Sequence, residues 1–259
     1  RPNDTIYLKG YQGNVYQDSA WGNTDAYFTK ACEERNLDEQ EVAKTLLQNL
    51  YWHKQNVNTL LSGLPINDKG ISFTLEYEVA ASNKAYLPHG TDYTSLDKEV
   101  TLRGDGIVQK AIYDRKISGI FLPKTWVPRM MTSPEWGKYS WYDDVARTNN
   151  LFVPEELKVF FDTLGVRTNV AYQSDRLETA QYVKKYLESK MVYSLDLDEL
   201  PADVDPIIYA LTEGGEGYCM HFASAGTLIL RYLGIPARYV SGYVVHNSAI
   251  EAQGTQYVA

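Results

Sequence analysis

One stretch decides the fold, residues 213–245, which reads EGGEGYCMHFASAGTLILRYLGIPARYVSGYVV. Three glycines lead up to Cys219, and apolar side chains then recur at the spacing of one buried helix face. Gly234 and Pro236 end that helix, because glycine favours the position after the last turn and proline cannot continue it. The β-branched and aromatic run 237–245 predicts a strand packed against the helix. The stretch therefore predicts a glycine loop, a helix that begins at Cys219, and a strand.

This arrangement places the thiol of Cys219 at a helix N-terminus. Unpaired backbone N–H groups and the helix dipole favour negative charge there, so the thiolate, the nucleophilic form of cysteine, is stabilised. The N–H of Cys219 is also oriented to help hold an oxyanion. We therefore predict Cys219 as a catalytic nucleophile. The alternative is a buried structural cysteine, and the glycines directly before the thiol argue against it.

The same residues resemble the core of bacterial transglutaminase-like domains, which are related to papain-type cysteine proteases. The resemblance is carried by Gly-Tyr-Cys-x-x-Phe-Ala-x-Ala at 217–225 and by Leu-Arg-x-Leu-Gly-Ile-Pro-Ala-Arg-Tyr-Val-x-Gly-Tyr-Val at 230–244. It extends more loosely upstream to about residue 175. It implies a Cys-His-Asp triad in which the thiolate attacks a carbonyl, the His moves the proton and the Asp orients the His.

The His and Asp of that triad are missing where the resemblance places them. In the family the His usually begins a His-Ala-Trp-type strand beyond the Gly-Tyr-Val strand, whereas this chain ends at Ala259 without one. We expect a domain truncated before its catalytic His and Asp, and inactive in this form. His246, at the end of the predicted strand, is a candidate substitute base, but an isolated His at a strand end is usually a surface residue. His221 should point about 200° around the helix from Cys219, away from the thiol.

The resemblance leaves the reaction open. A thioester on Cys219 that reacts with water gives proteolysis or deamidation, and one that reacts with an amine gives cross-linking. We favour hydrolysis because many bacterial members of the family are peptidases. The substrate is then a protein or peptide, cell-wall peptides included. The alternative is a non-catalytic surface module that uses the fold as a binding scaffold. No cofactor and no metal site are predicted. Tyr193 has two interpretations: a group beside the active site, or a core tyrosine.

The first two-thirds of the chain are mainly β. Residues 71–79 alternate apolar and polar, an Asp-Gly turn joins strand runs at 98–102 and 107–113, and a third run covers 116–122. Helices are predicted at 39–55, 154–164 and 175–189, with a polar linker at 166–174. The prediction is an α+β chain with a β-rich N-terminal domain containing inserted helices at 1–170 and a transglutaminase-like core at 171–259, incomplete at its C-terminus.

Composition restricts the class of protein. The chain has 259 residues, 44% hydrophobic and 22% charged, which is typical of a folded protein. A net charge of −8 argues against a nucleic-acid partner, and no apolar run reaches the ~18 residues of a membrane span. A disulfide between Cys32 and Cys219 is not expected.

Residues 6–21 resemble the extracellular part that precedes this domain in multi-pass membrane proteins of Gram-positive bacteria. The resemblance places the chain on the extracellular face of a bacterial membrane, as part of a membrane-anchored protein. We also expect the strand at 237–245 to lack later neighbours. An exposed strand edge invites pairing with another chain, so self-association is a further prediction.

Overall fold

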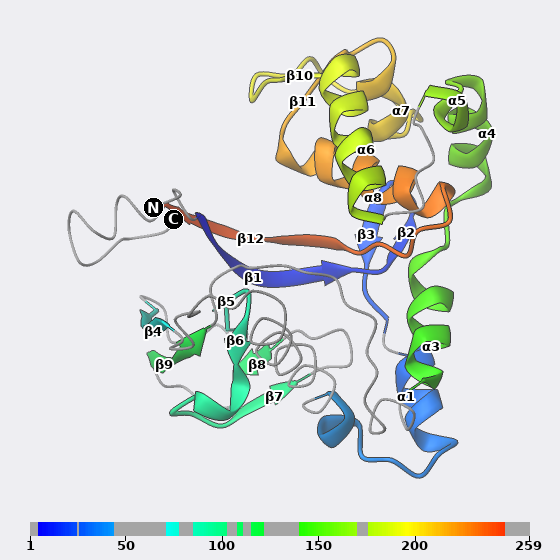
Figure 1. Ribbon diagram of the computed structural model, residues 1–259. Coiled ribbons are helices and arrows are strands. Elements are labelled where there is room, and N and C mark those ends of the chain that lie inside the picture. The colour runs from blue at the N-terminus through cyan, green and yellow to red at the C-terminus, as the bar shows by residue number, and fades with distance from the viewer. Residues whose placement is uncertain are drawn as a thin grey trace, which may run out of the picture. The chain divides into compact units, whose positions relative to one another are not determined.

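The computed structural model describes residues 5–24, 26–43, 71–77, 85–102, 108–110, 115–121, 140–169 and 176–246. The fold is α+β, as predicted (Figure 1). The chain divides into two compact units. Unit 1 comprises residues 1–11, 25–142 and 241–259, and unit 2 comprises residues 12–24 and 143–240. Each unit is therefore assembled from segments that lie far apart in the sequence.

Unit 1 contains the β-rich part of the chain. β4 (Ile71–Glu76) pairs antiparallel with β9 (Lys116–Phe121) along its whole length, and β6 (Thr91–Asp92) pairs with the other edge of β9. β7 (Val100–Leu102) and β8 (Val108–Lys110) form a separate antiparallel pair. The predicted strands at 71–79, 98–102, 107–113 and 116–122 are confirmed within the described residues. A short 3-10 helix, η1 (Tyr93–Ser95), follows β6.

A further sheet joins the two ends of the chain. Its order is β12–β1–β5, with β1 (Thr5–Gly13) between β12 (Tyr239–His246) and β5 (Leu87–Pro88) (Figure 1). Gly242 permits close pairing, because a Cβ at this position would lie 1.9 Å from the carbonyl oxygen of Leu8. The outer edge of β12 has no strand partner in the described part of the chain. Self-association through this edge stays a prediction.

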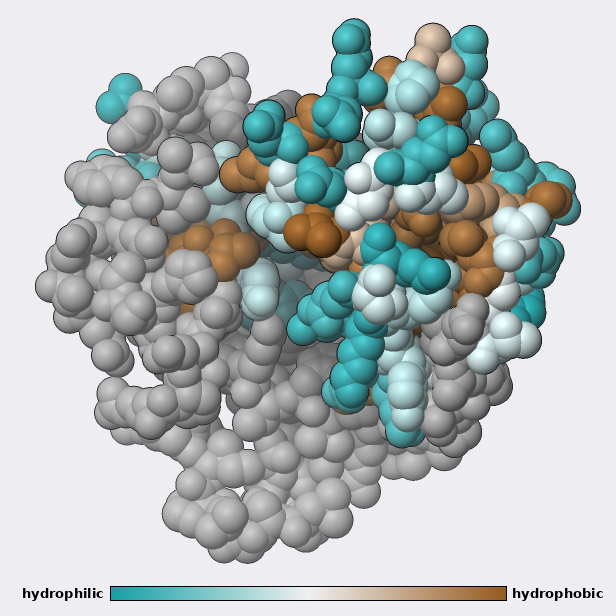
Figure 2. All heavy atoms as spheres, turned by 90° about the horizontal axis from the view of Figure 1, so that it is seen from above, coloured by the Kyte–Doolittle hydropathy of each residue, from teal (hydrophilic) through white to brown (hydrophobic). Residues whose placement is uncertain are grey.

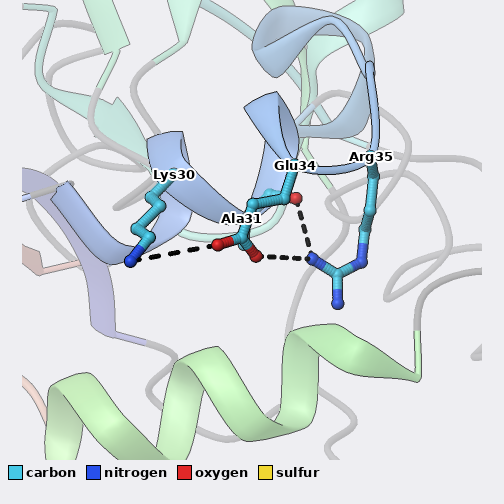
Figure 3. Close-up of polar contacts among 4 residues, drawn as sticks. All are labelled: Lys30, Ala31, Glu34 and Arg35. Carbon is cyan, nitrogen blue, oxygen red and sulfur yellow. Dashed lines mark hydrogen bonds and ion pairs between the residues drawn. The ribbon is translucent and has the colours of Figure 1, made fainter.

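The first helix of unit 1, α1, packs through one buried face. α1 (Ala26–Glu33) buries Phe28, Ala31 and Cys32. Just past its end, the carboxylate of Glu34 lies 3.9 Å from Lys30 and 3.7 Å from Arg35, and Arg35 donates to the carbonyl of Ala31 at 3.0 Å (Figure 3). Exposed ion pairs of this kind contribute little stability.

The helix predicted at 39–55 is confirmed at residues 39–43, and its remainder lies outside the described residues. Asp38 caps it as expected, since its carboxylate accepts the N–H of Glu41 at 2.9 Å. The side chain of Gln40 then bonds both the N–H and the carbonyl of Leu102. These two bonds attach the helix to β7.

Unit 2 is mainly helical. Its described elements, in chain order, are β2 (Val15–Gln17), β3 (Ala20–Gly22), α3 (Trp141–Asn150, except its first two residues), α4 (Glu155–Thr163), α5 (Val166–Asn169), α6 (Arg176–Lys190), β10 (Val192–Tyr193), α7 (Pro206–Leu211), β11 (Glu216–Gly217) and α8 (Cys219–Tyr232). The helices predicted at 154–164 and 175–189 are confirmed as α4 and α6.

The predicted linker at 166–174 is wrong at its start, because α5 occupies its first four residues and Val166 is fully buried. Val166 packs into the core, and the polar residues after it gave no sign of this in the sequence. The boundary predicted between residues 170 and 171 falls inside unit 2.

The core of unit 2 surrounds α8, which packs against α4, α6 and α7 (Figure 1). Ala225, Leu228 and Ile229 of α8 are fully buried. The surrounding helices and the residues that flank them complete this core with Val153, Leu157, Phe161, Val166, Val183, Tyr186, Leu187, Met191, Ile207, Ala210 and Leu211. Burial of this continuous apolar face fixes the position of the helix that begins at Cys219.

Candidate active site

The glycine loop before Cys219 is held in place by a two-stranded parallel ribbon of β10 and β11. Val192 donates its N–H to the carbonyl of Gly215 at 2.8 Å, and Ser194 donates to Gly217 at 3.0 Å. Gly215 has φ +60°, which favours glycine. A Cβ on Gly217 would lie 2.8 Å from the Cβ of His221. The loop therefore needs glycine at both positions to reach the helix.

α8 begins at Cys219, as predicted. The carbonyl of Tyr218 accepts the N–H groups of His221 and Phe222 at 2.9 and 3.3 Å. In the described part of the chain, no acceptor contacts the N–H groups of Cys219 and Met220. Both are therefore available to a negatively charged group at the helix N-terminus.

Cys219 is exposed and free of a disulfide. The interpretation of Cys219 as a buried structural cysteine is therefore wrong. Its Sγ has no hydrogen-bond partner among the described residues, so no base contacts the thiol there. What the arrangement offers chemically is an accessible sulfur next to two available backbone donors.

His221 caps the helix. Its Nδ1 accepts the N–H of Tyr218 at 3.3 Å, and its ring lies edge-on to the Tyr218 ring at 4.5 Å. Burial lowers the pKa of His221, which favours the neutral ring that this hydrogen bond requires. That His221 points away from the thiol stays a prediction. His246 is the last residue of β12, and its side chain lies outside the described residues.

Tyr193 lies beside the first turn of α8. Its ring stacks on that of Phe222 with centroids 6.3 Å apart, and 60% of the residue is exposed. The interpretation of Tyr193 as a core tyrosine is therefore wrong. Because residues three apart share one side of a helix, the Phe222–Tyr193 pair lies next to Cys219. Nothing in the sequence distinguished this aromatic pair from a buried one.

Sequence reasoning missed the contribution of the N-terminal hairpin β2–β3 to the support of the site. Trp21 donates its Nε1–H to Ser224 Oγ of α8 at 2.8 Å and stacks on Tyr239 at 5.2 Å. Tyr16 donates its hydroxyl to Asp205, the N-cap of α7, at 2.9 Å. Burial, and then the charge of Asp205, raises the pKa of Tyr16, so its hydroxyl keeps the proton that it donates. The hairpin thus packs against both helices.

Arg231, near the end of α8, joins three segments of unit 2. It is only 2% exposed, and its guanidinium donates to the carbonyls of Ala237 at 2.7 Å, Asn14 at 2.9 Å and Phe152 at 3.1 Å. Burial, and to a smaller extent Arg238, lowers the pKa of Arg231 to about 10, which leaves it charged at neutral pH. This buried cation, bonded to three carbonyls through Nε and Nη1, fixes these segments around α8.

A surface depression lies in the other unit, not in the unit that contains Cys219. An open depression of about 380 Å³ lies on β4 and β9 in unit 1, lined by residues that include Ser72, Thr74, Asp97 and Ser118, whereas Cys219 belongs to unit 2. Within the described ranges, no three His, Cys, Asp or Glu side chains are grouped so as to hold a metal ion. No helix in those ranges is long and apolar enough to cross a membrane.

Comparison with known proteins agrees with this geometry. Residues 165–259 match the family described as the transglutaminase-like superfamily. This part of the chain is therefore similar to that superfamily. The match begins at Gly165, two residues after the end of α4, and includes the glycine loop, α8 and β12.

Two solved structures share the fold, both of the periplasmic domain of TgpA from Pseudomonas aeruginosa. The match to the first has a TM-score of 0.51 at 15% sequence identity, and it covers 94% of this chain and 71% of the TgpA chain. The match to the second, which is bound to ethylmercury, has a TM-score of 0.50 at 16% sequence identity, and it covers 95% of this chain and 77% of the TgpA chain. No curated protein matches the chain. At these identities the likeness concerns the fold alone.

Proposed function

We propose that Cys219 is the nucleophile of a thiol-dependent acyl transfer or amide hydrolysis. The observation that carries this proposal is the position of the thiol: Cys219 is exposed, is the first residue of α8, and lies beside two backbone N–H groups without an acceptor in the described part of the chain. A thiolate at a helix N-terminus is stabilised by the dipole and by those donors. The match to the transglutaminase-like superfamily supports the same chemistry.

The proposed reaction combines this geometry with the triad that the family resemblance implies. The sulfur attacks an amide carbonyl, a C–S bond forms, and the carbonyl oxygen takes negative charge that the N–H of Cys219 helps to hold. The His of the Cys-His-Asp triad that the resemblance implies takes the proton of the thiol and gives it to the leaving amine as the C–N bond breaks. Water or a second amine attacks the thioester and releases Cys219. Water gives hydrolysis, which we favour, and an amine gives cross-linking.

We place this activity outside the cytoplasmic membrane, on a protein or peptide substrate that includes cell-wall peptides. The two similar structures are periplasmic domains, which supports an extracytoplasmic location.

The test uses an activated acyl donor whose leaving group departs without being protonated by a general acid. The full chain is incubated with p-nitrophenyl acetate, and the acetylated residue is identified by peptide mass spectrometry. We expect one acetyl group on Cys219, none on the Cys219→Ser variant, and an unchanged rate on the Cys32→Ser variant. Release of acetyl to water or to an added primary amine then separates hydrolysis from transfer. Acetylation of Cys219 no faster than that of the unfolded chain would overturn the proposal in favour of a scaffold role.

A further inference from the structure

We propose that the surface beside Cys219 binds an extended, basic polypeptide carrying apolar side chains, and that this is the substrate class of the site. This inference rests on the proposed function of Cys219 as nucleophile. The surface, here called the β10 surface, consists of Val192, Tyr193, Leu195 and Met220. Three properties support the assignment: exposed apolar area, an open strand edge and unpaired negative charge.

The apolar side chains of the β10 surface are exposed to an unusual degree. Val192 is 66% exposed, Tyr193 60%, Leu195 79% and Met220 51%. Figure 2 views the molecule from the side on which β10 lies in Figure 1, and brown apolar side chains reach the surface there among hydrophilic ones. The Tyr193–Phe222 stack connects this area to the first turn of α8, where Cys219 lies. Exposed apolar area next to a nucleophile is suited to hold substrate side chains.

The ribbon has an open edge that suits an extended chain. Val192 and Ser194 direct their N–H groups to β11. Because successive residues of a strand alternate in direction, the N–H and C=O of Tyr193 point to the opposite edge. Those two groups have no partner in the described part of the chain. A peptide that pairs with this edge gains main-chain hydrogen bonds and places alternate side chains on the β10 surface.

The negative charge of the residues in and near this ribbon favours a positively charged peptide. Residues 191–230 contain seven Asp and Glu and no Lys or Arg. One of the seven, Asp205, is engaged as the N-cap of α7. The other six are exposed and have no ion-pair partner within the described ranges: Asp196, Asp198, Glu199, Asp203, Glu213 and Glu216. Glu216 pairs directly with Val192 across the ribbon. Such a field attracts cations and repels anions.

The same charge argues against other occupants. A second copy of this chain carries a net charge of −8, and nucleic acids and bacterial membranes are also anionic, so all three would be repelled. A small polyamine would satisfy the acidic side chains but would leave the apolar area and the strand edge unused. An extended polypeptide with Lys or Arg alternating with apolar residues uses all three properties.

The test measures binding apart from reaction, on the full chain carrying Cys219→Ser. The probe is a dye-labelled peptide of alternating Lys and Val, followed by fluorescence anisotropy, and a Glu-Val peptide of equal length is the comparison. We expect binding of the Lys-Val peptide that weakens as salt is raised, and no binding of the Glu-Val peptide.

Matched variants locate the site. Glu216→Lys should weaken binding about fivefold, whereas Glu156→Lys, the same change on exposed α4, should change it less than about twofold. Leu195→Ser should weaken it about threefold, and Val159→Ser, on α4, should not. Equal effects of the paired variants, tight binding of the Glu-Val peptide, or full competition by spermine would each overturn the proposal. Acetylation of Cys219 is measured separately, so failure of docking and failure of the nucleophile assignment give different results.

Discussion

At the scale of single residues, the two cysteines show how environment sets reactivity. Cys32 is 2% exposed, and burial, followed by the charge of Glu39, raises its pKa to about 11. Cys219 is exposed at a helix N-terminus. At pH 8, we expect iodoacetamide to label Cys219 faster than Cys32 by a factor on the order of 100, because only the thiolate reacts. In denaturant both residues should react at similar rates. Comparable labelling of the two thiols in the native chain would contradict this prediction.

A second residue-scale prediction concerns His221. Its pKa is lowered from 6.5 by burial, so the unfolded chain binds more protons than the folded chain below that pH. Stability from the neutral ring is therefore fully present above about pH 6.5 and is lost as the pH falls toward the lower folded-state pKa. Urea unfolding between pH 5 and 8 should show a smaller loss of stability at low pH for His221→Ala than for the parent chain. Parallel pH profiles would remove His221 as the titrating group.

At the scale of elements, the glycine loop and α8 act as one unit, and Gly217 is the point of closest approach. A Cβ there would lie 2.8 Å from the Cβ of His221. We expect Gly217→Ala to cost about 1–3 kcal/mol, as overpacking does, and to slow acetylation of Cys219 because Tyr218 and His221 must move. Gly226→Ala in α8 is the control, since its new Cβ would lie 3.5 Å from Leu187, an ordinary contact. The two variants are compared by urea unfolding and by acetylation rate.

Several helices and strands of both units could be predicted because their signals are local. The apolar period of α8, the stop at Gly234 and the alternation in β4 are each contained within a few turns or residues. Val166 shows the limit: one buried apolar residue in a polar stretch carries no period, yet its burial fixes α5. The stacking of Tyr193 on Phe222 could not be predicted either, because it depends on how β10 lies against α8, which only the tertiary structure determines.

At the scale of the whole molecule, the unit that holds Cys219 is discontinuous in sequence. Residues 12–24 belong to unit 2, although more than a hundred residues separate them from α3. No local pattern marks that association, which is why a continuous domain from about residue 171 was predicted. Tyr16 lies in the core of unit 2, Trp21 bonds Ser224, and Arg231 bonds the carbonyl of Asn14. The hairpin is therefore part of the unit that holds Cys219.

This arrangement predicts opposite effects of two N-terminal deletions. A chain that begins at residue 12 keeps the hairpin, whereas one that begins at residue 26 removes Tyr16 and Trp21 and leaves the guanidinium of Arg231 without the carbonyl of Asn14. Tyr16 is buried in the core and Trp21 is partly buried against it. Loss of a large aromatic side chain from a packed core costs about 3–5 kcal/mol, so α8 should open far more often in the shorter chain. Hydrogen exchange of α8 peptides measures this opening. We expect protection of α8 to be kept when residues 1–11 are removed and lost when residues 1–25 are removed. Equal protection of α8 in both chains would mean that the helices hold Cys219 in place without the hairpin.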